Sequence, residues 1–436
     1  MKLKHMLATL CILVPALALM AITPFQTLSQ SKSGLRIRFQ TPNLRIESEE
    51  IGGESFHRIS AEDAMSSALD GMPELPVFST SFALPPTGGF RINVVQGSQR
   101  IVTGIRPVPV FPADEDRINL QYNRSAYVTS DLYPADPVVT GDISIFRDFR
   151  VAQVSITPAK WHASSGDLVI SEDMELEIEF TPGSAPNEMP GYQSYSAAFR
   201  NLYEANIINF DQYRELNPVL SNSRILIIYG NYTNTVYNQL ITSFAEWKRR
   251  KGHEVNVVST SVAGTSNTAI KNYIQTQYNN LTTRPDYIIL IGDTTGSFPI
   301  PTWIENWSSY QGEGDYPYTF LAGNDTVGDV LIGRLSAETV EQLSTIMSRN
   351  YSYERNINND PAMAEWLNRM LLIGDPSTSG ISCVYTNKYV KELAQNVNPD
   401  YSFIENYSGG YPNTINSGIN QGVSFFNYRG YIGMSS

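Results

Sequence analysis

The feature that most constrains the fold is a change in hydrophobic periodicity near residue 223. Before it, apolar and polar residues alternate in short runs separated by Pro and Gly. Alternation with a period of two places the apolar side chains on one face of a strand. Residues 31–182 are therefore predicted to form an all-β sandwich of antiparallel sheets. The runs that carry this prediction are 34–40, 89–95, 99–105, 150–156 and 174–180.

After residue 223 the apolar runs are continuous, and they alternate with segments of helical spacing. Strands buried on both faces and linked by helices are typical of a parallel sheet with crossover connections. A first α/β unit is predicted for residues 223–356 and a second for residues 367–436. The second stops close to its last expected strand, so we expect an α/β domain that is incomplete at its C-terminal end. The expected strands are 225–229, 254–258, 287–291, 329–333, 369–375, 401–404 and 423–428, and the expected helices are 237–250, 266–279, 339–354 and 384–396.

Two further segments lie outside these domains. Residues 1–29 begin with basic residues, continue with an apolar stretch over residues 6–22 and end in small polar residues, which predicts a signal peptide cleaved near Ser29. No later window could cross a bilayer, so we expect a secreted or cell-surface protein without a membrane span. Residues 183–222 are rich in Pro and Gly and are predicted to be a linker, with a helical piece over residues 195–210.

The net charge limits the kinds of partner that are expected, and the cysteine count limits the disulfides. The chain carries a formal net charge of −12 and has no long block of Lys or Arg. Nucleic acids and anionic membranes attract basic surfaces, so neither is expected as a partner. Cys11 lies in the leader, and the exported chain would hold Cys383 alone, without an internal disulfide.

In open parallel sheets, ligand sites lie at the carboxyl ends of the strands. Residues that follow the expected strands are therefore the candidate reactive groups. Asp293 and Asp375 each end an expected strand in the sequence Ile-Gly-Asp, and residues 429–436 follow the last strand. Each aspartate could be a ligand or an acid/base, or it could cap the next element. The acidic turns around Asp315, Asp325 and Asp329 are either a set of oxygen ligands suited to Ca²⁺ or solvated turn residues.

Nucleophilic catalysis by cysteine needs a thiolate beside an imidazole. The sequence has four histidines, His5, His57, His162 and His253. We expect no dyad between Cys383 and His253, and Cys383 is interpreted as a small buried apolar residue. Zinc spacings, phosphate-binding loops and the Gly-x-Ser-x-Gly elbow are absent from the sequence.

Several motifs occur in a fixed order from residue 224 onward. They are Arg224-Ile-Leu-Ile-Ile, Phe244-Ala-Glu-Trp-Lys-Arg-Arg-Lys-Gly-His-Glu-Val, 270–278, Asp286-Tyr-Ile-Ile-Leu-Ile-Gly-Asp, Asp315-Tyr316 with Gly323-Asn-Asp, Asp329-Val-Leu-Ile-Gly-Arg-Leu-Ser and Tyr353-Glu-Arg-Asn. In this order they resemble the catalytic domain of the gingipain family of cysteine peptidases, family C25. Upstream, Gly71-Met-Pro-Glu-Leu-Pro and residues 150–158 resemble the β-rich propeptide of that family.

The resemblance implies a caspase-like α/β domain whose second unit carries a Cys/His dyad. The family histidine lies in Asn-Tyr-x-Gly-His-Gly-Ser, and the corresponding stretch here reads Asn427-Tyr-Arg-Gly-Tyr-Ile-Gly. Tyr431 thus occupies the histidine position, and Ile432 occupies the position of a glycine whose N–H helps to hold the oxyanion. The family cysteine lies beyond Ser436, so no intact catalytic residue is expected in this chain.

The same resemblance bears on cofactors. Gingipains bind calcium, which makes Asp293, Asp325 and Asp329 candidate Ca²⁺ ligands here. No other cofactor is implied. The aspartate that gives the best-known members their preference for basic residues has no clear match, so basic specificity is not carried over.

Two hypotheses for function follow. The first is a secreted cysteine endopeptidase made as a zymogen, which acts on proteins or peptides and whose propeptide-like domain packs on the α/β domain; these 436 residues would be its inactive N-terminal portion. The second is a lineage that has lost catalysis and serves as a binding or structural module of a secreted surface protein. Tyr431 favours the second hypothesis, and the motif match favours the first.

Overall fold

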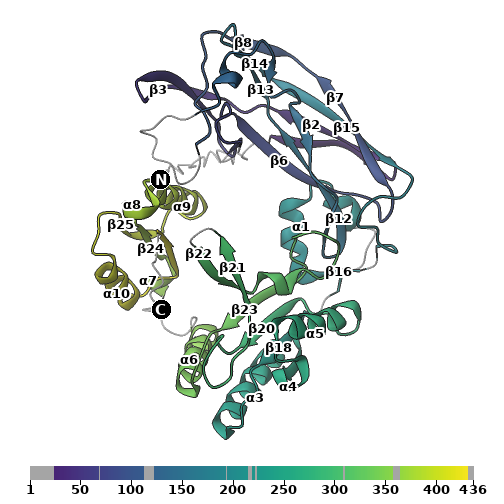
Figure 1. Cartoon of the computed structure of the whole chain (residues 1–436). Coiled ribbons are helices and arrows are strands. Elements are labelled where there is room, and N and C mark those ends of the chain that lie inside the picture. The colour runs from purple at the N-terminus through teal and green to yellow at the C-terminus, as the bar shows by residue number, and fades with distance from the viewer. Residues whose placement is uncertain are drawn as a thin grey trace, which may run out of the picture. The chain divides into compact units, whose positions relative to one another are not determined.

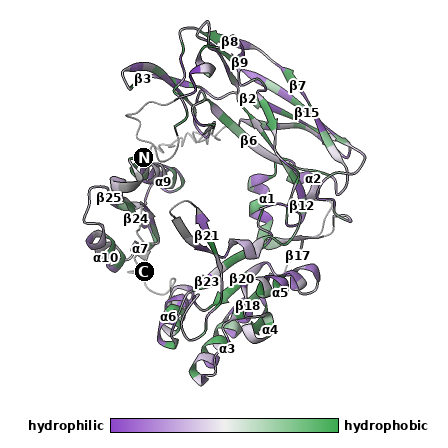
Figure 2. Cartoon of the chain, viewed as in Figure 1, coloured by the Kyte–Doolittle hydropathy of each residue, from purple (hydrophilic) through white to green (hydrophobic). Residues whose placement is uncertain are grey.

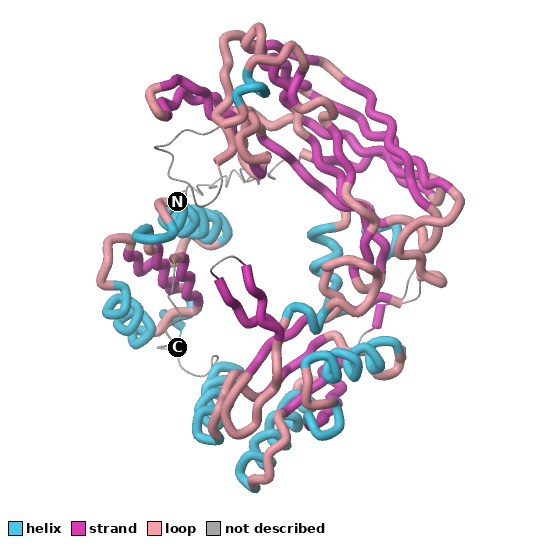
Figure 3. Tube along the Cα trace, in the orientation of Figure 1, coloured by secondary structure: helices cyan, strands magenta, loops and turns pink. Residues whose placement is uncertain are grey.

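The computed structural model describes residues 24–67, 69–111, 122–192, 194–214, 219–220, 223–307, 310–356 and 364–430. The chain forms two compact units. The N-terminal unit comprises Met1–Ser221 together with Ala322–Asp329, and the α/β unit comprises Asn222–Leu321 together with Val330–Ser436. Strands dominate the first of these units, whereas helices and strands alternate in the second (Figure 3).

A β-sandwich forms the larger part of the N-terminal unit. One sheet has the strand order β1–β2–β15–β7, and the facing sheet has the order β10–β12–β6–β5, with β11 also paired to β12. Both sheets are antiparallel. The strands are β1 (Phe25–Ser31), β2 (Gly34–Gln40), β5 (Met65–Ser66), β6 (Pro76–Ala83), β7 (Gly89–Gln96), β10 (Val138–Thr140), β11 (Ser144–Phe146), β12 (Phe149–Ile156) and β15 (Asp173–Thr181).

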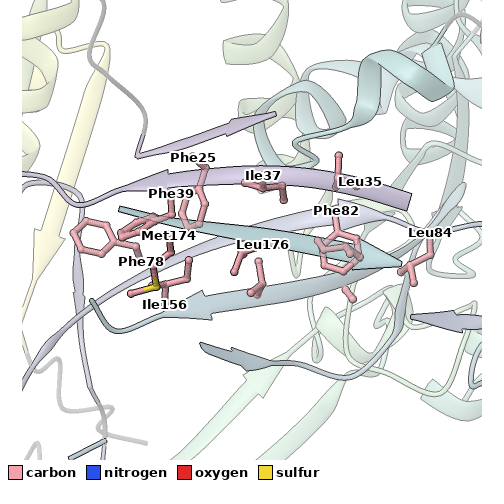
Figure 4. Packing of buried hydrophobic residues seen from close by; sticks show 13 residues of the cluster. Phe25, Leu35, Ile37, Phe39, Phe78, Phe82, Leu84, Ile156, Met174 and Leu176 are labelled. Carbon is pink, nitrogen blue, oxygen red and sulfur yellow. The ribbon is translucent and has the colours of Figure 1, made fainter. Parts of the chain in front are cut away.

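The strict alternation seen in the sequence explains how these sheets pack. Met174, Leu176 and Ile178 of β15 point into the sandwich core, where they meet the aromatic rings of the facing sheet (Figure 4). Glu175, on the other face of β15, forms ion pairs with Arg36 and Arg38 of β2 at 2.8 and 2.9 Å. Hydrophobic and hydrophilic colours accordingly alternate along this sheet in Figure 2. The predicted antiparallel sheet with one wet face is present.

A second layer of short strands completes the β-rich region. The sheet β8–β14–β13–β9 and the hairpin β3–β4 surround a separate core that includes Trp161 and Phe56. The sequence predicted one sandwich, and the structure instead divides these residues between two hydrophobic cores. These strands are β3 (Arg45–Ile51), β4 (Glu54–Ser60), β8 (Gln99–Val102), β9 (Leu132–Tyr133), β13 (Ala159–His162) and β14 (Asp167–Ser171).

The segment expected to be a linker is an integral part of the N-terminal unit. It contains β16 (Tyr195–Ser196), η2 (Ala197–Phe199), α1 (Arg200–Asn206), α2 (Phe210–Arg214) and β17 (Val219–Leu220). Tyr203 and Phe210 are buried, and their rings pack against Phe149 at centroid distances of 4.9 and 5.7 Å. The Pro and Gly residues that suggested a flexible connector therefore lie beside aromatic residues that anchor the segment to β12.

The first part of the α/β unit is a parallel sheet with the strand order β19–β18–β20–β23 (Figure 1). Ile225 and Ile227 of β18 pack with apolar residues of α3 and α6, and Leu226 and Ile228 on the opposite face are also buried. Both faces of the sheet are covered, as the continuous apolar runs predicted. The elements are β18 (Arg224–Tyr229), α3 (Thr235–Arg250), β19 (Glu254–Ser259), α4 (Thr260–Ala263), α5 (Asn267–Asn279), β20 (Tyr287–Ile291), η3 (Tyr316–Thr319), β23 (Leu331–Leu335) and α6 (Val340–Asn356).

The second part is a parallel sheet with the order β25–β24–β26. Its elements are α7 (Ala364–Leu367), β24 (Arg369–Gly374), α8 (Pro376–Ser379), α9 (Ser382–Val397), β25 (Ser402–Asn406), α10 (Tyr411–Gln421) and β26 (Phe425–Arg429). The sequence pattern did not lead to a prediction of α10, although Tyr411, Ile415 and Ile419 recur at four-residue spacing along it. The hairpin of β21 (Trp303–Trp307) and β22 (Tyr310–Gly314) was not predicted either. Among the described residues no helix is long and apolar enough to cross a membrane.

Candidate functional site

The carboxyl ends of β24 and β26 bring together two groups that the sequence nominated separately. The N–H of Asp375 donates to the carbonyl oxygen of Arg429 at 2.8 Å. A Cβ atom added to Gly430 would lie 2.7 Å from Cβ of Asp375 and 2.7 Å from the hydroxyl oxygen of Tyr428. Any larger residue would have to displace these atoms, so Gly430 lets the chain pass directly beside the aspartate.

Asp375 is surrounded by hydrogen-bond donors. Its Oδ1 accepts the N–H of Ser377 at 3.0 Å and the Ser377 hydroxyl at 2.6 Å. These two bonds, together with one from Tyr411, hold the pKa of Asp375 below its ordinary value. Burial, followed by the nearby charge of Asp375, raises the pKa of both Tyr411 and Tyr428. At neutral pH the cluster is therefore one carboxylate beside two neutral phenols, an arrangement that offers negative charge and hydrogen-bond donors.

Cys383 lies within α9 and has no solvent access. Its carbonyl oxygen accepts the side-chain amide of Asn387 at 2.8 Å, and the same amide donates to Ile373 of β24. Asn427 of β26 donates to the Asn387 oxygen at 3.0 Å. The predicted burial of Cys383 is confirmed, and a thiol without access to solvent cannot attack a substrate.

His253 stands at the amino end of β19, the end opposite to the expected ligand edge. Its Nδ1 contacts the hydroxyl of Ser223. Burial, and then the positive charges of Lys251 and Lys248, lower its pKa. These contacts give His253 a structural role at the start of the strand.

Asp293 follows β20 and takes part in a tight turn. Its Oδ1 accepts the N–H of Thr294 at 2.7 Å, and its main chain bonds to Ala337 and Ile300. The preceding Gly292 has φ of 141°, and a Cβ there would lie 2.2 Å from the carbonyl oxygen of Phe298. The Ile-Gly-Asp motif therefore marks a strand end over which the following chain folds closely.

A bidentate ion pair near the carboxyl end of the first α/β sheet was not singled out from the sequence. Arg334 forms a bidentate pair with Asp315, with its Nε at 2.8 Å from Oδ2 and its Nη2 at 2.7 Å from Oδ1. Its Nη1 also donates to the carbonyl oxygens of Gly292 and Ile300, both at 2.9 Å. The available signal was one charged residue inside the otherwise apolar strand 331–335.

The two remaining calcium candidates lie in the loop 322–329, which belongs to the N-terminal unit, whereas Asp293 belongs to the α/β unit. The carboxylate oxygens of Asp325 and Asp329 accept backbone N–H groups, two from the loop itself and two from Ile145 and Arg147. Among the described residues no group of three or more His, Cys, Asp or Glu side chains is arranged to hold a metal ion. The calcium site stays a prediction. Tyr431 and Ile432 lie outside the described residues.

Comparison with known sequences covers both units. The profile of peptidase family C25 matches residues 220–436, and the profile of the C25 propeptide matches residues 23–216. Gingipain R1 of Porphyromonas gingivalis is 25% identical over 421 residues, which is 92% of this chain and 40% of that protein. Gingipain R2 of the same species is 25% identical over 93% of this chain and 55% of that protein, and a Lys-gingipain is 23% identical over 90% and 23%. The chain thus spans between about a quarter and about half of the length of these relatives.

Two solved structures are similar over smaller parts of the chain. The crystal structure of the Arg-specific cysteine proteinase gingipain R has a TM-score of 0.39 and 27% identity over 48% of this chain and 46% of that chain. The complex of the P. gingivalis RgpB pro- and mature domains has a TM-score of 0.39 and 19% identity over 43% of this chain and 97% of that chain.

Proposed function

Because this chain belongs to peptidase family C25, the gingipain family, we propose that it is the N-terminal portion of a cysteine endopeptidase zymogen. The observation that carries the proposal is the succession of the two family matches, the propeptide over residues 23–216 and the peptidase over residues 220–436. In this proposal the N-terminal unit packs on the α/β domain as its propeptide, and the substrates are proteins or peptides.

We further propose that these 436 residues do not hydrolyse peptides by themselves. Cysteine peptidases need an accessible thiolate and an imidazole to move its proton, and Cys383 is buried on α9. The resemblance implies that Tyr431, the residue after Gly430 in the sequence, stands at the position of the family histidine. A phenol with a pKa near 10 is a poor proton acceptor at neutral pH. In this proposal the nucleophile is supplied by polypeptide beyond Ser436 in a longer product.

Export is a third part of the proposal. The basic start and the apolar stretch over residues 6–22 support a leader that directs the protein to the cell surface or the medium. Those residues lie outside the described part of the chain, which begins at Pro24. β1 pairs with β2 from Phe25 onward, which supports a leader that ends before Phe25.

The test is an assay of the longest product of the reading frame, beside the 436-residue chain. A broad peptide library and a thiol-directed active-site probe are applied to both at neutral pH. We expect cleavage and labelling of a downstream cysteine in the longer product alone. Restoring the imidazole with Tyr431→His is expected to raise its rate by about 10²- to 10⁴-fold, the usual contribution of a positioned acid/base.

The matched control for that substitution is Tyr428→His, which adds an imidazole three residues away on β26. This control substitution is expected not to raise the rate of peptide cleavage. A folded longer product that neither cleaves the library nor takes up the probe, with or without Tyr431→His, would overturn the peptidase proposal and support the binding module in its place.

A further inference from the structure

The loop Ala322–Asp329 folds with the N-terminal unit, although the peptidase profile includes its sequence. The chain enters it from η3, which ends at Thr319, and leaves it into β23, which begins at Leu331. Both flanking elements belong to the α/β unit. Asp329, the last residue of the loop, is completely buried. β23 begins two residues later than the sequence predicted.

Two carboxylates of the loop accept N–H groups from β11 and from the turn that follows it. The N–H of Ile145 donates to Oδ2 of Asp325 at 2.8 Å, and the N–H of Arg147 donates to Oδ1 of Asp329 at 3.1 Å. In the described part of its sheet, β11 pairs with β12. Its other edge presents alternate N–H groups, of the kind that an additional strand would use. The two aspartates, four residues apart, occupy these donors, and hydrogen bonds to ionised acceptors are the stronger kind.

Side chains of the N-terminal unit complete the contact. The Arg147 guanidinium is 2% exposed, donates from Nη1 to the carbonyl oxygen of Asp329 at 2.7 Å and lies 4.8 Å from the centre of the Phe199 ring. Asn187 bonds to the loop in both directions: its amide donates to Asp325 at 3.2 Å, and its oxygen accepts the N–H of Asn324 at 2.9 Å. The loop is thus held at both of its aspartates.

The backbone at this contact adopts conformations that L residues rarely use. Three non-glycine residues in the described part of the chain have positive φ, and two of them, Arg147 (51°) and Asn187 (57°), hold the loop. On the loop itself, Gly323 has φ of 73°, and a Cβ there would lie 2.4 Å from Oδ2 of Asp325. Such outliers persist where surrounding contacts impose them, and they mark sites with a specific role.

We propose that the loop 322–329 is a clasp that keeps the propeptide bound to the peptidase domain after the connecting chain has been cut. The proposal rests on the proposed function, because it assigns the N-terminal unit as a propeptide. The surface that receives the loop is the edge of β11 that faces away from β12, together with Arg147 and Asn187. Release of the propeptide then requires the loop to leave this surface, so the clasp sets how long latency outlasts the cut.

The experiment uses the whole chain from Pro24 with a site for a sequence-specific protease inserted after Ser221, at the boundary between the units. After complete cleavage, size-exclusion chromatography and dilution measure whether the pieces stay together and with what dissociation constant. We expect the unaltered pieces to elute as one complex. The double variant Asp325→Ala with Asp329→Ala is expected to raise the dissociation constant by about tenfold to a hundredfold, because each substitution removes charge-assisted hydrogen bonds.

Two further variants keep the test decisive if the double variant fails to fold. Asn187→Gly keeps a residue that tolerates positive φ but removes both side-chain contacts with the loop, together with the bond to the carbonyl oxygen of Ile143. It is expected to weaken the complex about tenfold. Asn324→Ala is the control within the loop, because only its N–H contacts Asn187 and its side chain is exposed. It is expected to leave the dissociation constant unchanged.

Unaltered pieces that separate at once, or folded clasp variants that bind as tightly as the unaltered chain, would overturn the proposal. The readout is binding rather than hydrolysis, so it is independent of whether a longer product cleaves peptides. A clasp that fails this test would leave the peptidase assignment untouched, and an inactive longer product would leave the clasp measurable.

Discussion

At the scale of single residues, Arg334 determines the geometry at the carboxyl end of the first α/β sheet. Its guanidinium is 12% exposed and connects Asp315, which follows β22, with the carbonyl groups of Gly292 and Ile300. A guanidinium can serve a bidentate carboxylate and two carbonyls at once because its donors lie in one rigid plane. The ammonium group of a lysine lacks this geometry.

Arg334→Lys is therefore expected to lower the free energy of unfolding by about 2–4 kcal/mol, because part of a buried ion pair is left without its partner. Urea unfolding followed by fluorescence measures the change. The control is Arg249→Lys, whose pair with Glu246 on α3 is half-exposed and is expected to change stability by less than about 0.5 kcal/mol. Equal losses in the two variants would contradict the role given to Arg334.

At the scale of elements, Glu354 joins α6 to α3. It accepts hydrogen bonds from Lys248, at 2.7 Å, and from the indole N–H of Trp247, and it pairs with Lys251 at 3.1 Å. Burial alone would raise the pKa of Glu354, but the hydrogen bonds from Lys248, Trp247 and Lys251 outweigh it and lower the pKa to about 2. The carboxylate is thus favoured in the folded state.

A carboxyl group with a lowered folded-state pKa stabilises the protein above its unfolded pKa, near 4.5 here, and this contribution is lost as the pH falls toward 2. Glu354→Gln is expected to cost on the order of 2–3 kcal/mol at pH 7 and progressively less below pH 4. Urea unfolding at several pH values measures the difference from the unaltered chain. The control is Glu341→Gln, at the exposed start of α6. A difference in unfolding free energy between Glu354→Gln and the unaltered chain that does not shrink at low pH would contradict the role given to the Glu354 carboxylate.

Another prediction at this scale concerns β1. The strand Phe25–Ser31 pairs with β2, and Phe25 lies in the sandwich core (Figure 4). Cleavage near Ser29, as the sequence suggested, would remove most of this strand. We expect the leader to be removed before Phe25, which the intact mass of exported protein would reveal. A chain that begins at Gln30 is expected to unfold at a lower urea concentration than a chain that begins at Pro24. Exported protein whose N-terminus is Gln30 would contradict cleavage before Phe25.

At the scale of the whole molecule, the division into units does not follow the order of the chain. Residues 183–221 and 322–329 both fold with the N-terminal unit, the first through the aromatic cluster around Phe149 and the second through Asp325 and Asp329. The family profiles meet between residues 216 and 220, which is close to the end of the continuous part of that unit. The loop 322–329 is the exception, because it lies within the peptidase profile but folds with the N-terminal unit. It is the segment that we propose to be a clasp.

The sequence by itself determined the class of each domain, because hydrophobic periodicity records which faces of an element are buried. The alternation in residues 174–180 predicted the wet face of β15, and the continuous apolar run at 287–291 predicted the buried parallel strand β20. The ordered motifs were sufficient to identify the family. The rule that ligand sites lie at the carboxyl ends of strands nominated Asp375 and residues 429–436, and the structure shows that Asp375 lies beside Arg429 and Gly430.

Only the tertiary structure decided which distant residues meet. Arg334 with Asp315, Tyr411 with Asp375, and Arg147 with Asp329 are pairs whose members come from different elements, and local pattern carries no information about such pairing. The same limit applies to Asp325 and Asp329, for which calcium binding remains a prediction. A carboxylate suits a metal ion and a backbone N–H equally well, and the choice depends on what the fold brings within about 3 Å of its oxygens.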